Sequence, residues 1–196
     1  MTGCASQKYS LVETGDFELT SSDLAKFGVA FITPSIVTGQ EQYSQSLALS
    51  FSRTMKELRP EISIIPLSNT LSLINEGGLI DEYKNMYGNY RDTGIFDQDI
   101  IRKISKVTGA RYLAQLKLSA FSQKSANRFS FGVRLIETKY SQMRLFFQIW
   151  DSLNGAIVWE GSAEVNYSYD TFSDNTVSFR TVVQLTTIEL IKKIPR

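Results

Sequence analysis

The stretch AIVWEGSAEVNYSY, residues 156–169, alternates along its length and decides the fold predicted for this chain. Every second residue, from Ile157 through Trp159 to Tyr169, is apolar, aromatic or glycine, whereas the residues between them, from Glu160 to Ser168, are polar. Because successive side chains of a β-strand point to opposite faces, this pattern predicts a strand with one buried face and one face in water.

Similar alternation extends this strand into a sheet. Residues 111–121, 129–135 and 143–151 repeat the pattern, so residues 110–169 are predicted to hold four strands. The turn between the last two ends in Asn154-Gly155, a pair that tolerates positive φ angles and favours a hairpin. We therefore expect an antiparallel meander that acts as a scaffold and carries no evident catalytic group.

The segment before the meander predicts parallel strands. Residues 26–32 and 61–66 are short apolar runs that end at or near prolines, and residues 41–58 between them place Leu47, Phe51 and Met55 at helical spacing. Strand, helix and strand in this order predict a βαβ unit, with a right-handed crossover between parallel strands.

Three further helices are predicted at residues 67–76, 97–107 and 176–194. The second has Asp97 or Asp99 near its N-terminus and Gly109 as its stop. The last has two apolar stripes, which leaves open whether it is buried between layers or turns one face to a neighbouring subunit. These stripes are Phe179, Val183, Leu190 and Ile194, and Val177, Leu185, Ile188 and Ile191.

These elements together predict an α/β (α+β) fold. We expect a three-layer sandwich with a mixed sheet, an N-terminal βαβ unit, a C-terminal antiparallel meander and a terminal helix. The 196 residues, 42% of them hydrophobic, suit a single domain, which we place at residues 23–196. The net charge of +1 argues against nucleic acid as the main partner.

The composition offers little for catalysis. The chain has no histidine and one cysteine, which excludes the commonest acid–base group, histidine ligation of zinc and an intramolecular disulfide. Carboxylate pairs such as Glu160 and Glu164 are present, but phosphate-binding and nucleophile motifs are not. We therefore expect a protein that is not an enzyme and that uses no metal or cofactor.

The single cysteine lies in the segment Thr2-Gly3-Cys4-Ala5-Ser6, which resembles the end of a bacterial lipobox. There, small residues precede a cysteine that signal peptidase II exposes and that is then acylated, which anchors the protein at about 0.8 kcal/mol per buried methylene. The alternative is an ordinary exposed cysteine in a frayed terminus. Because residues 5–22 are rich in serine, threonine and glycine, residues 1–22 are predicted to be a lipidation site and flexible tether.

An unusual group of tyrosines lies within residues 79–97. Tyr83 and Tyr87 are one helical turn apart, Tyr90 follows three residues later, and Arg91 is next to it. One interpretation is an amphipathic helix that lays its tyrosine edge on the core. The other is a partner-binding surface, because tyrosine and arginine are enriched at the centres of protein interfaces.

The order of elements resembles the curli-secretion lipoprotein family (CsgG-like), with its relatives in Pel polysaccharide export (PelC-like) and the amino-terminal domain of TolB. The similarity covers about residues 27–194. Two motifs carry it: Gly109-Ala110-Arg111-Tyr112, where a helix gives way to a strand, and the hairpin Asp151…Gly155…Val158-Trp159. The curli channel also has two long amphipathic hairpins, for which residues 122–128 are too short and too polar, so the accessory-ring members are the better comparison.

The resemblance implies a lipid anchor at Cys4 and a place on the periplasmic face of the bacterial outer membrane. It implies a non-enzymatic, ring-forming homo-oligomer that serves as a structural or assembly component of an envelope export or envelope-spanning complex. One alternative is a monomeric periplasmic ligand-binding or regulatory module that recruits an envelope partner. A carboxylate-dependent hydrolase is a third hypothesis, which requires two convergent carboxyl groups with raised pKa values.

Overall fold

The computed structural model describes residues 6–17, 19–37, 39, 42–128, 136–171 and 177–195. Its strands are β1 (Ser6–Asp16), β2 (Val29–Phe31), β3 (Ser35–Ile36), β4 (Ile64–Ile65), β5 (Tyr112–Arg128), β6 (Ile136–Asp151) and β7 (Ala156–Thr171). Its helices are α1 (Ser21–Phe27), α2 (Tyr43–Leu58), α3 (Leu67–Glu76), α4 (Ile80–Thr93), α5 (Gln98–Thr108) and α6 (Phe179–Ile191).

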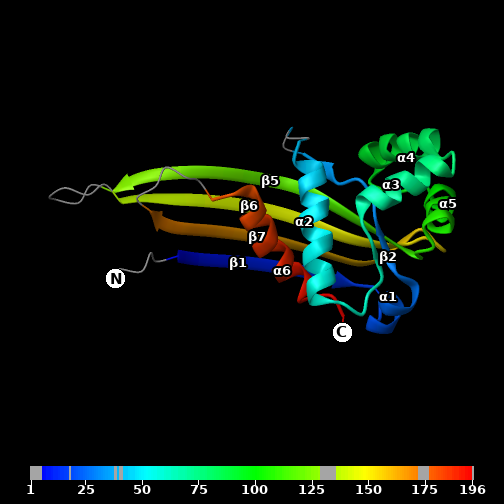
Figure 1. Ribbon diagram of the computed structural model, residues 1–196, viewed down its shortest axis with the longest axis horizontal. Helices are drawn as coiled ribbons and strands as arrows, with labels where there is room; N and C mark the ends of the chain where they lie inside the picture. The colour runs from blue at the N-terminus through cyan, green and yellow to red at the C-terminus, as the bar shows by residue number, and fades with distance from the viewer. Residues whose placement is uncertain are drawn as a thin grey trace.

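All the described strands belong to one mixed sheet in the order β1-β7-β6-β5-β2-β4, and β3 also pairs with β5 (Figure 1). Strands β5, β6, β7 and β1 pair with one another antiparallel in this succession, whereas β5 is parallel to β2 and β3, and β2 is parallel to β4. The predicted βαβ unit (β2, α2, β4) and the antiparallel meander (β5, β6, β7) are therefore confirmed. So is the α+β fold class.

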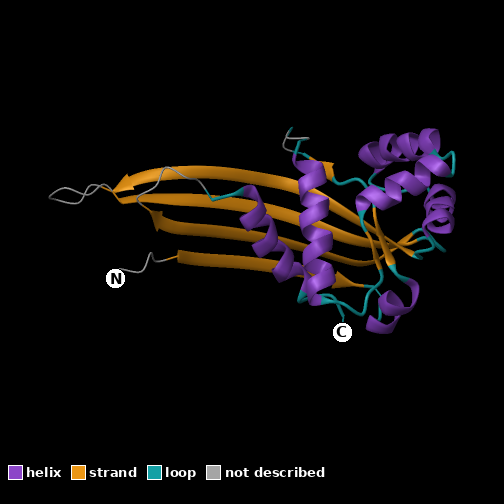
Figure 2. Cartoon of the chain, in the orientation of Figure 1, coloured by secondary structure: helices purple, strands orange, loops and turns teal. Residues whose placement is uncertain are grey.

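The helices cover the two faces of the sheet unequally (Figure 2). Helices α2 and α6 pack on one face, where Phe31, Phe51, Phe147 and Trp159 belong to the larger core. Helices α3, α4 and α5 cover the opposite face only at the end that holds β2 and β4, around a second core that includes Trp150. The opposite face is therefore left open along the far part of the four long strands, and we call this surface the outer face.

Helix α6 lies beside α2 on the same face of the sheet, and its contacts with both explain its two apolar stripes. Val182, Val183 and Leu190 are fully buried, and the helix contacts β6, β7 and β1 as well as α2. A Cβ atom at Gly161 of β7 would lie 3.2 Å from Leu190 and 2.6 Å from the ring of Trp159, so glycine permits the close approach. The structure favours burial of α6 against both the sheet and α2 over a stripe reserved for another subunit.

Local sequence signals set the ends of α5 as predicted. The Asp97 carboxylate accepts hydrogen bonds from the backbone N–H groups of Asp99 and Ile100, at 3.0 and 3.2 Å. This is the N-cap geometry that satisfies amides left free by the first turn. Gly109 follows the helix with a φ of 73°, and its N–H group bonds to the carbonyl of Ser105.

The prediction of a flexible tether at residues 1–22 is wrong for most of that segment. Ser6–Asp16 forms β1, an 11-residue strand paired with β7 along its whole length, and α1 begins at Ser21. An edge strand leaves one of its hydrogen-bonding edges and one of its two faces in water, so its amino-acid composition is close to that of a linker. The backbone hydrogen bonds to β7 hold residues 6–16 in this strand. Cys4 lies outside the described residues.

The meander also differs in detail from its prediction. Residues 122–128 are the end of β5 rather than an insertion, and the predicted strand at residues 129–135 lies outside the described part of the chain. The predicted strand at 26–32 is shorter, because its first residues belong to α1. Of the helices that the structure describes, none is both long and apolar enough to span a bilayer.

Candidate interaction surfaces

The tyrosines of α4 point toward the sheet. The Tyr83 hydroxyl accepts a hydrogen bond from the Thr33 N–H group at 2.9 Å, and the Tyr87 hydroxyl donates to the Thr33 carbonyl at 2.7 Å. The Tyr90 ring stacks on Phe96 at 4.1 Å, which in turn meets Trp150 edge-on at 5.0 Å. These contacts attach α4 to the segment between β2 and β3 and to the second core.

Burial raises the pKa of all three α4 tyrosines. The effect is largest for Tyr87, whose pKa lies well above its ordinary value of 10.0 because its buried phenolate would lose water. The pKa values of Tyr83 and Tyr90 are raised for the same reason. The phenols are therefore neutral hydrogen-bonding groups at physiological pH.

The structure thus agrees with the first interpretation of residues 79–97, in which an amphipathic helix lays its tyrosine edge on the core. Tyr83, Tyr87 and Tyr90 support the fold, whereas Arg91 is on the surface, where its side chain is 81% exposed and pairs with the adjacent Asp92. A partner-binding role for these four residues stays a prediction. It would involve their exposed rim, which is the surface of α4 around Arg91.

That rim borders a cleft of about 980 Å³ between α4 and the β3 segment. Lys84 and Arg91 come from α4, Lys117 comes from β5, and the backbone of Pro34 to Val37 forms the opposite wall. A Cβ atom added at Gly88 would meet nothing within 4 Å, which shows how open the α4 wall is. Counted over the described lining residues, three cations stand against the one carboxylate of Asp92, which makes this cleft suited to an anionic group.

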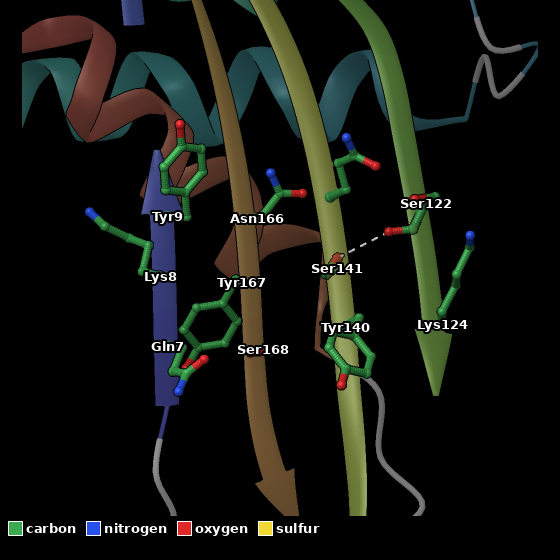
Figure 3. A pocket seen from close by; sticks show the side chains of 11 residues that line it. Gln7, Lys8, Tyr9, Ser122, Lys124, Tyr140, Ser141, Asn166, Tyr167 and Ser168 are labelled. Atoms are coloured by element: carbon green, nitrogen blue, oxygen red, sulfur yellow. Dashed lines mark hydrogen bonds between the residues drawn. The ribbon is translucent and has the colours of Figure 1, made fainter. Parts of the chain in front are cut away.

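A second hollow, of about 700 Å³, lies on the outer face, across β1, β7, β6 and β5 (Figure 3). Tyr9 is 65% exposed and Tyr140 is 41% exposed there, beside the polar side chains of Gln7, Asn166 and Lys124. Exposed tyrosines among amides and hydroxyls are typical of protein interfaces. The sequence alternation assigned this face to water but did not indicate that it is hollowed.

A polar network fixes the middle of the outer face. Arg144 binds the Glu164 carboxylate through Nε, at 2.9 Å, and through a second guanidinium nitrogen, and Gln142 donates to its other oxygen at 2.9 Å. The hydrogen bond from Arg144 is the main reason that the pKa of Glu164 is lowered. A lowered pKa is the opposite of what a general acid needs, so the hydrolase hypothesis gains no support here.

Metal-site geometry is likewise absent from the described part of the chain, where no three acidic or cysteine side chains converge. The pKa shifts resolved for described carboxyl groups, those of Asp23, Glu137, Glu164 and Glu189, are all downward. Both the expected lack of a cofactor and the expected lack of catalysis stay predictions.

The two motifs that carried the family resemblance meet in space. Arg111 of the first motif donates to Asp151 of the second through two nitrogens, at 3.0 and 2.6 Å, and Asp151 also accepts from the Leu153 N–H group. The Asp151 side chain is 3% exposed. Hydrogen bonding to Asp151 raises the pKa of Arg111. These motifs are therefore structural, because they connect the start of β5 to the β6–β7 hairpin.

Strand β1 is held to α6 by an ion pair in which Lys8 Nζ lies 2.6 Å from Glu189 Oε1. The hydrogen bond from Lys8 lowers the pKa of Glu189 below 4.5 in the folded protein. A carboxyl group with a lowered folded-state pKa adds stability above its unfolded pKa, and this stability is lost as the pH falls through the folded value.

We expect Glu189→Gln to lower the free energy of unfolding by about 1 kcal/mol at pH 7, and to match the wild type once the pH is well below 4.5. Urea unfolding at the two pH values measures this difference. Glu76→Gln is the control, because Glu76 of α3 is exposed and has no ion pair among the described residues. An equal loss at both pH values would contradict the assignment to the ion pair.

Comparison with known proteins gives structural matches only. No protein-family model matches the sequence, and no curated protein matches it either. Among solved structures, the PelC dodecamer from Paraburkholderia phytofirmans aligns with a TM-score of 0.52 at 13% identity, over 96% of this chain and 99% of that chain. This chain has the PelC fold.

Two further solved structures align with this chain. A second PelC dodecamer structure aligns at 12% identity and a TM-score of 0.51, over 93% of this chain and 96% of that one. Lipoprotein GNA1162 from Neisseria meningitidis aligns at 13% identity and a TM-score of 0.44, over 85% and 97%. The expected resemblance is thus confirmed for PelC at the level of the fold. The resemblances to CsgG and TolB stay predictions.

Proposed function

We propose that this protein is a non-enzymatic, lipid-anchored assembly component of the bacterial envelope, which associates with copies of itself into a ring. The observation that carries this proposal is the PelC fold, which extends over 96% of this chain and 99% of a subunit taken from a dodecamer. The lipobox-like segment around Cys4 supports an anchor on the periplasmic face of the outer membrane.

The long strands fit this role. The four strands of the outer face extend beyond the helices, and exposed tyrosines lie on them (Figure 1). A surface of this kind can join protein subunits, whereas the described residues offer no cluster of acidic or cysteine ligands for a metal. Export, or another process that spans the envelope, is the context in which such a ring would act.

The test starts from the gene with its full upstream region. We expect the protein purified from membranes to begin at Cys4, to be heavier by two or three acyl chains, and to sediment as one discrete species of many subunits. An unmodified chain that retains Met1 would contradict the anchor, and a monomer at micromolar concentration would contradict the ring.

A monomeric module that recruits an envelope partner is the second candidate. The cationic cleft beside α4 favours it, because a cavity of about 980 Å³ could take an anionic segment of another protein. A monomeric protein that loses a membrane partner when both Lys84 and Arg91 are changed to serine would establish this function instead.

A further inference from the structure

The sheet has two open edges on its far part, one on each side. Among the described residues, β1 pairs only with β7, along all 11 of its residues. Strand β5 pairs with β2 and β3 no further than Leu118, and from Ala120 to Arg128 β6 is its only pairing partner within the described part of the chain. Figure 3 shows β1 and β5 as the outermost strands of this region.

The open edge of β1 presents free backbone groups at alternate residues. The Phe17 N–H group donates to the Val158 carbonyl of β7, at 3.0 Å. Since hydrogen-bonding direction alternates along an antiparallel strand, the odd-numbered residues of β1 bond to β7. The N–H and C=O groups of Ser10, Val12 and Thr14 therefore point to the open edge.

Neither edge carries a proline or a bulge within the stretch that is open to pairing with another chain. Proline, which blocks edge pairing, is absent from β1 and β5. Lys8 does not guard the β1 edge, because its ammonium group is bound to Glu189 of α6. The one irregularity of β5 lies between Leu118 and Ala120, and its register with β6 is unbroken from there to Arg128.

Strand direction makes the two edges complementary to each other. Strands β5 and β7 run one way, and β6 and β1 run the other way. If copies repeat by rotation about an axis along the strands, β1 of one copy is antiparallel to β5 of the next. Pairing of β1 with β1 would instead give a dimer in which both β5 edges stay open.

Charge on the outer face agrees with this arrangement. Glu13 projects from β1, and Lys117 and Lys124 project from β5 on the same face. All three are exposed, and none forms an ion pair with another described residue. Lys124 lies on the open part of β5, whereas Lys117 lies where β5 still pairs with β3. A β1 edge placed against the open β5 edge therefore brings Glu13 toward one basic side chain, whereas two such β5 edges would bring lysines together.

We propose that neighbouring copies join head to tail through backbone pairing of β1 with the Ala120–Arg128 edge of β5, which makes one continuous antiparallel sheet around the assembly. This inference rests on the proposed self-association and specifies its interface. Each copy uses both edges once, so the arrangement closes without leaving a long edge in water.

Proline at an edge-facing amide tests the pairing. Ser10→Pro removes an N–H group that points away from β7, and proline is tolerated on an edge strand of this kind. We expect the variant to keep the far-ultraviolet circular dichroism spectrum of the wild type. Its melting temperature should lie within about 4 °C of the wild-type value, because the change is a modest one at the surface of a domain of this size. It should sediment as a monomer. The matched control Ser10→Thr keeps the amide and should assemble like the wild type.

The outcomes separate this inference from the proposed function. A wild type that is itself monomeric overturns the self-association and the interface together. An assembled wild type whose Ser10→Pro variant assembles equally well overturns the interface alone, because pairing at the β1 edge could not survive the loss.

Disulfide cross-linking decides the matter if Ser10→Pro does not fold. In a Cys4→Ser background, Tyr9→Cys is combined in turn with Ser122→Cys, Lys124→Cys or Ala126→Cys, all on the outer face. We expect at least one double variant to give a ladder of linked multimers under mild oxidation, and no single variant to give linked species. A linked dimer from Tyr9→Cys alone, or an assembled protein that no pair cross-links, would overturn the proposal.

Discussion

Replacement of Phe147 by alanine should lower the free energy of unfolding by about 3–5 kcal/mol, the cost of a large cavity in a packed core. The side chain is fully buried, and its ring lies 4.6 Å from the ring of Phe51, 5.6 Å from that of Trp159 and 6.3 Å from that of Phe31. These rings come from α2, β7 and β2, so the loss weakens the contact between the sheet and its main helical layer.

The matched control is the adjacent residue. Phe146 lies on the same strand but on the outer face, where it is 39% exposed, so Phe146→Ala should cost less than about 1 kcal/mol. Urea unfolding followed by tryptophan fluorescence gives both values from the transition midpoints, provided that the slopes agree. Similar losses in the two variants would mean that the outer face is covered in the folded protein in solution.

Removal of the Asp151 carboxylate should be almost as damaging. We expect Asp151→Ala to cost about 3–5 kcal/mol, because it leaves the Arg111 guanidinium without its partner of 2.6 Å in a partly buried site. The same change removes the acceptor of the Leu153 N–H group, which shapes the β6–β7 hairpin. Out of a total stability of about 5–15 kcal/mol for a typical domain, this is a large share.

Thermal unfolding at neutral pH measures this effect, with Glu82→Ala as the control. Glu82 also has a cationic partner, Lys103 at 3.5 Å, but both side chains are more than one third exposed. Exposed ion pairs contribute about 0–1 kcal/mol, so the control should melt close to the wild type. A mild phenotype for Asp151→Ala would show that the hairpin is held by its turn rather than by Arg111.

The tyrosines of α4 show why a functional surface was difficult to predict. Helical spacing correctly placed Tyr83 and Tyr87 one turn apart, but spacing says nothing about whether that edge faces the protein or the solvent. The deciding partner, Thr33, is 50 residues away from Tyr83 in the sequence and binds both hydroxyls. Arg91 follows Tyr87 by one helical turn, yet its side chain is exposed.

The sequence by itself determined the elements whose signals are local. Alternation gave the meander, since side chains of a strand must separate a wet face from a dry one, and Asp97 and Gly109 set the ends of α5 through backbone groups within one turn. The order of strand, helix and strand also predicted the βαβ unit, because a chain of L-amino acids makes the crossover between parallel strands almost always in the right-handed sense.

Only the tertiary structure decided which polar strands pair and which surfaces stay open. Ser6–Asp16 lacks the apolar content that marks a strand, and its order comes from hydrogen bonds to β7, about 150 residues further along the chain. The two open edges and the hollowed outer face arise in the same way. They depend on where β2, β3 and the helices stop covering the long strands, and backbone pairing across such distances leaves little trace in the local pattern of side chains.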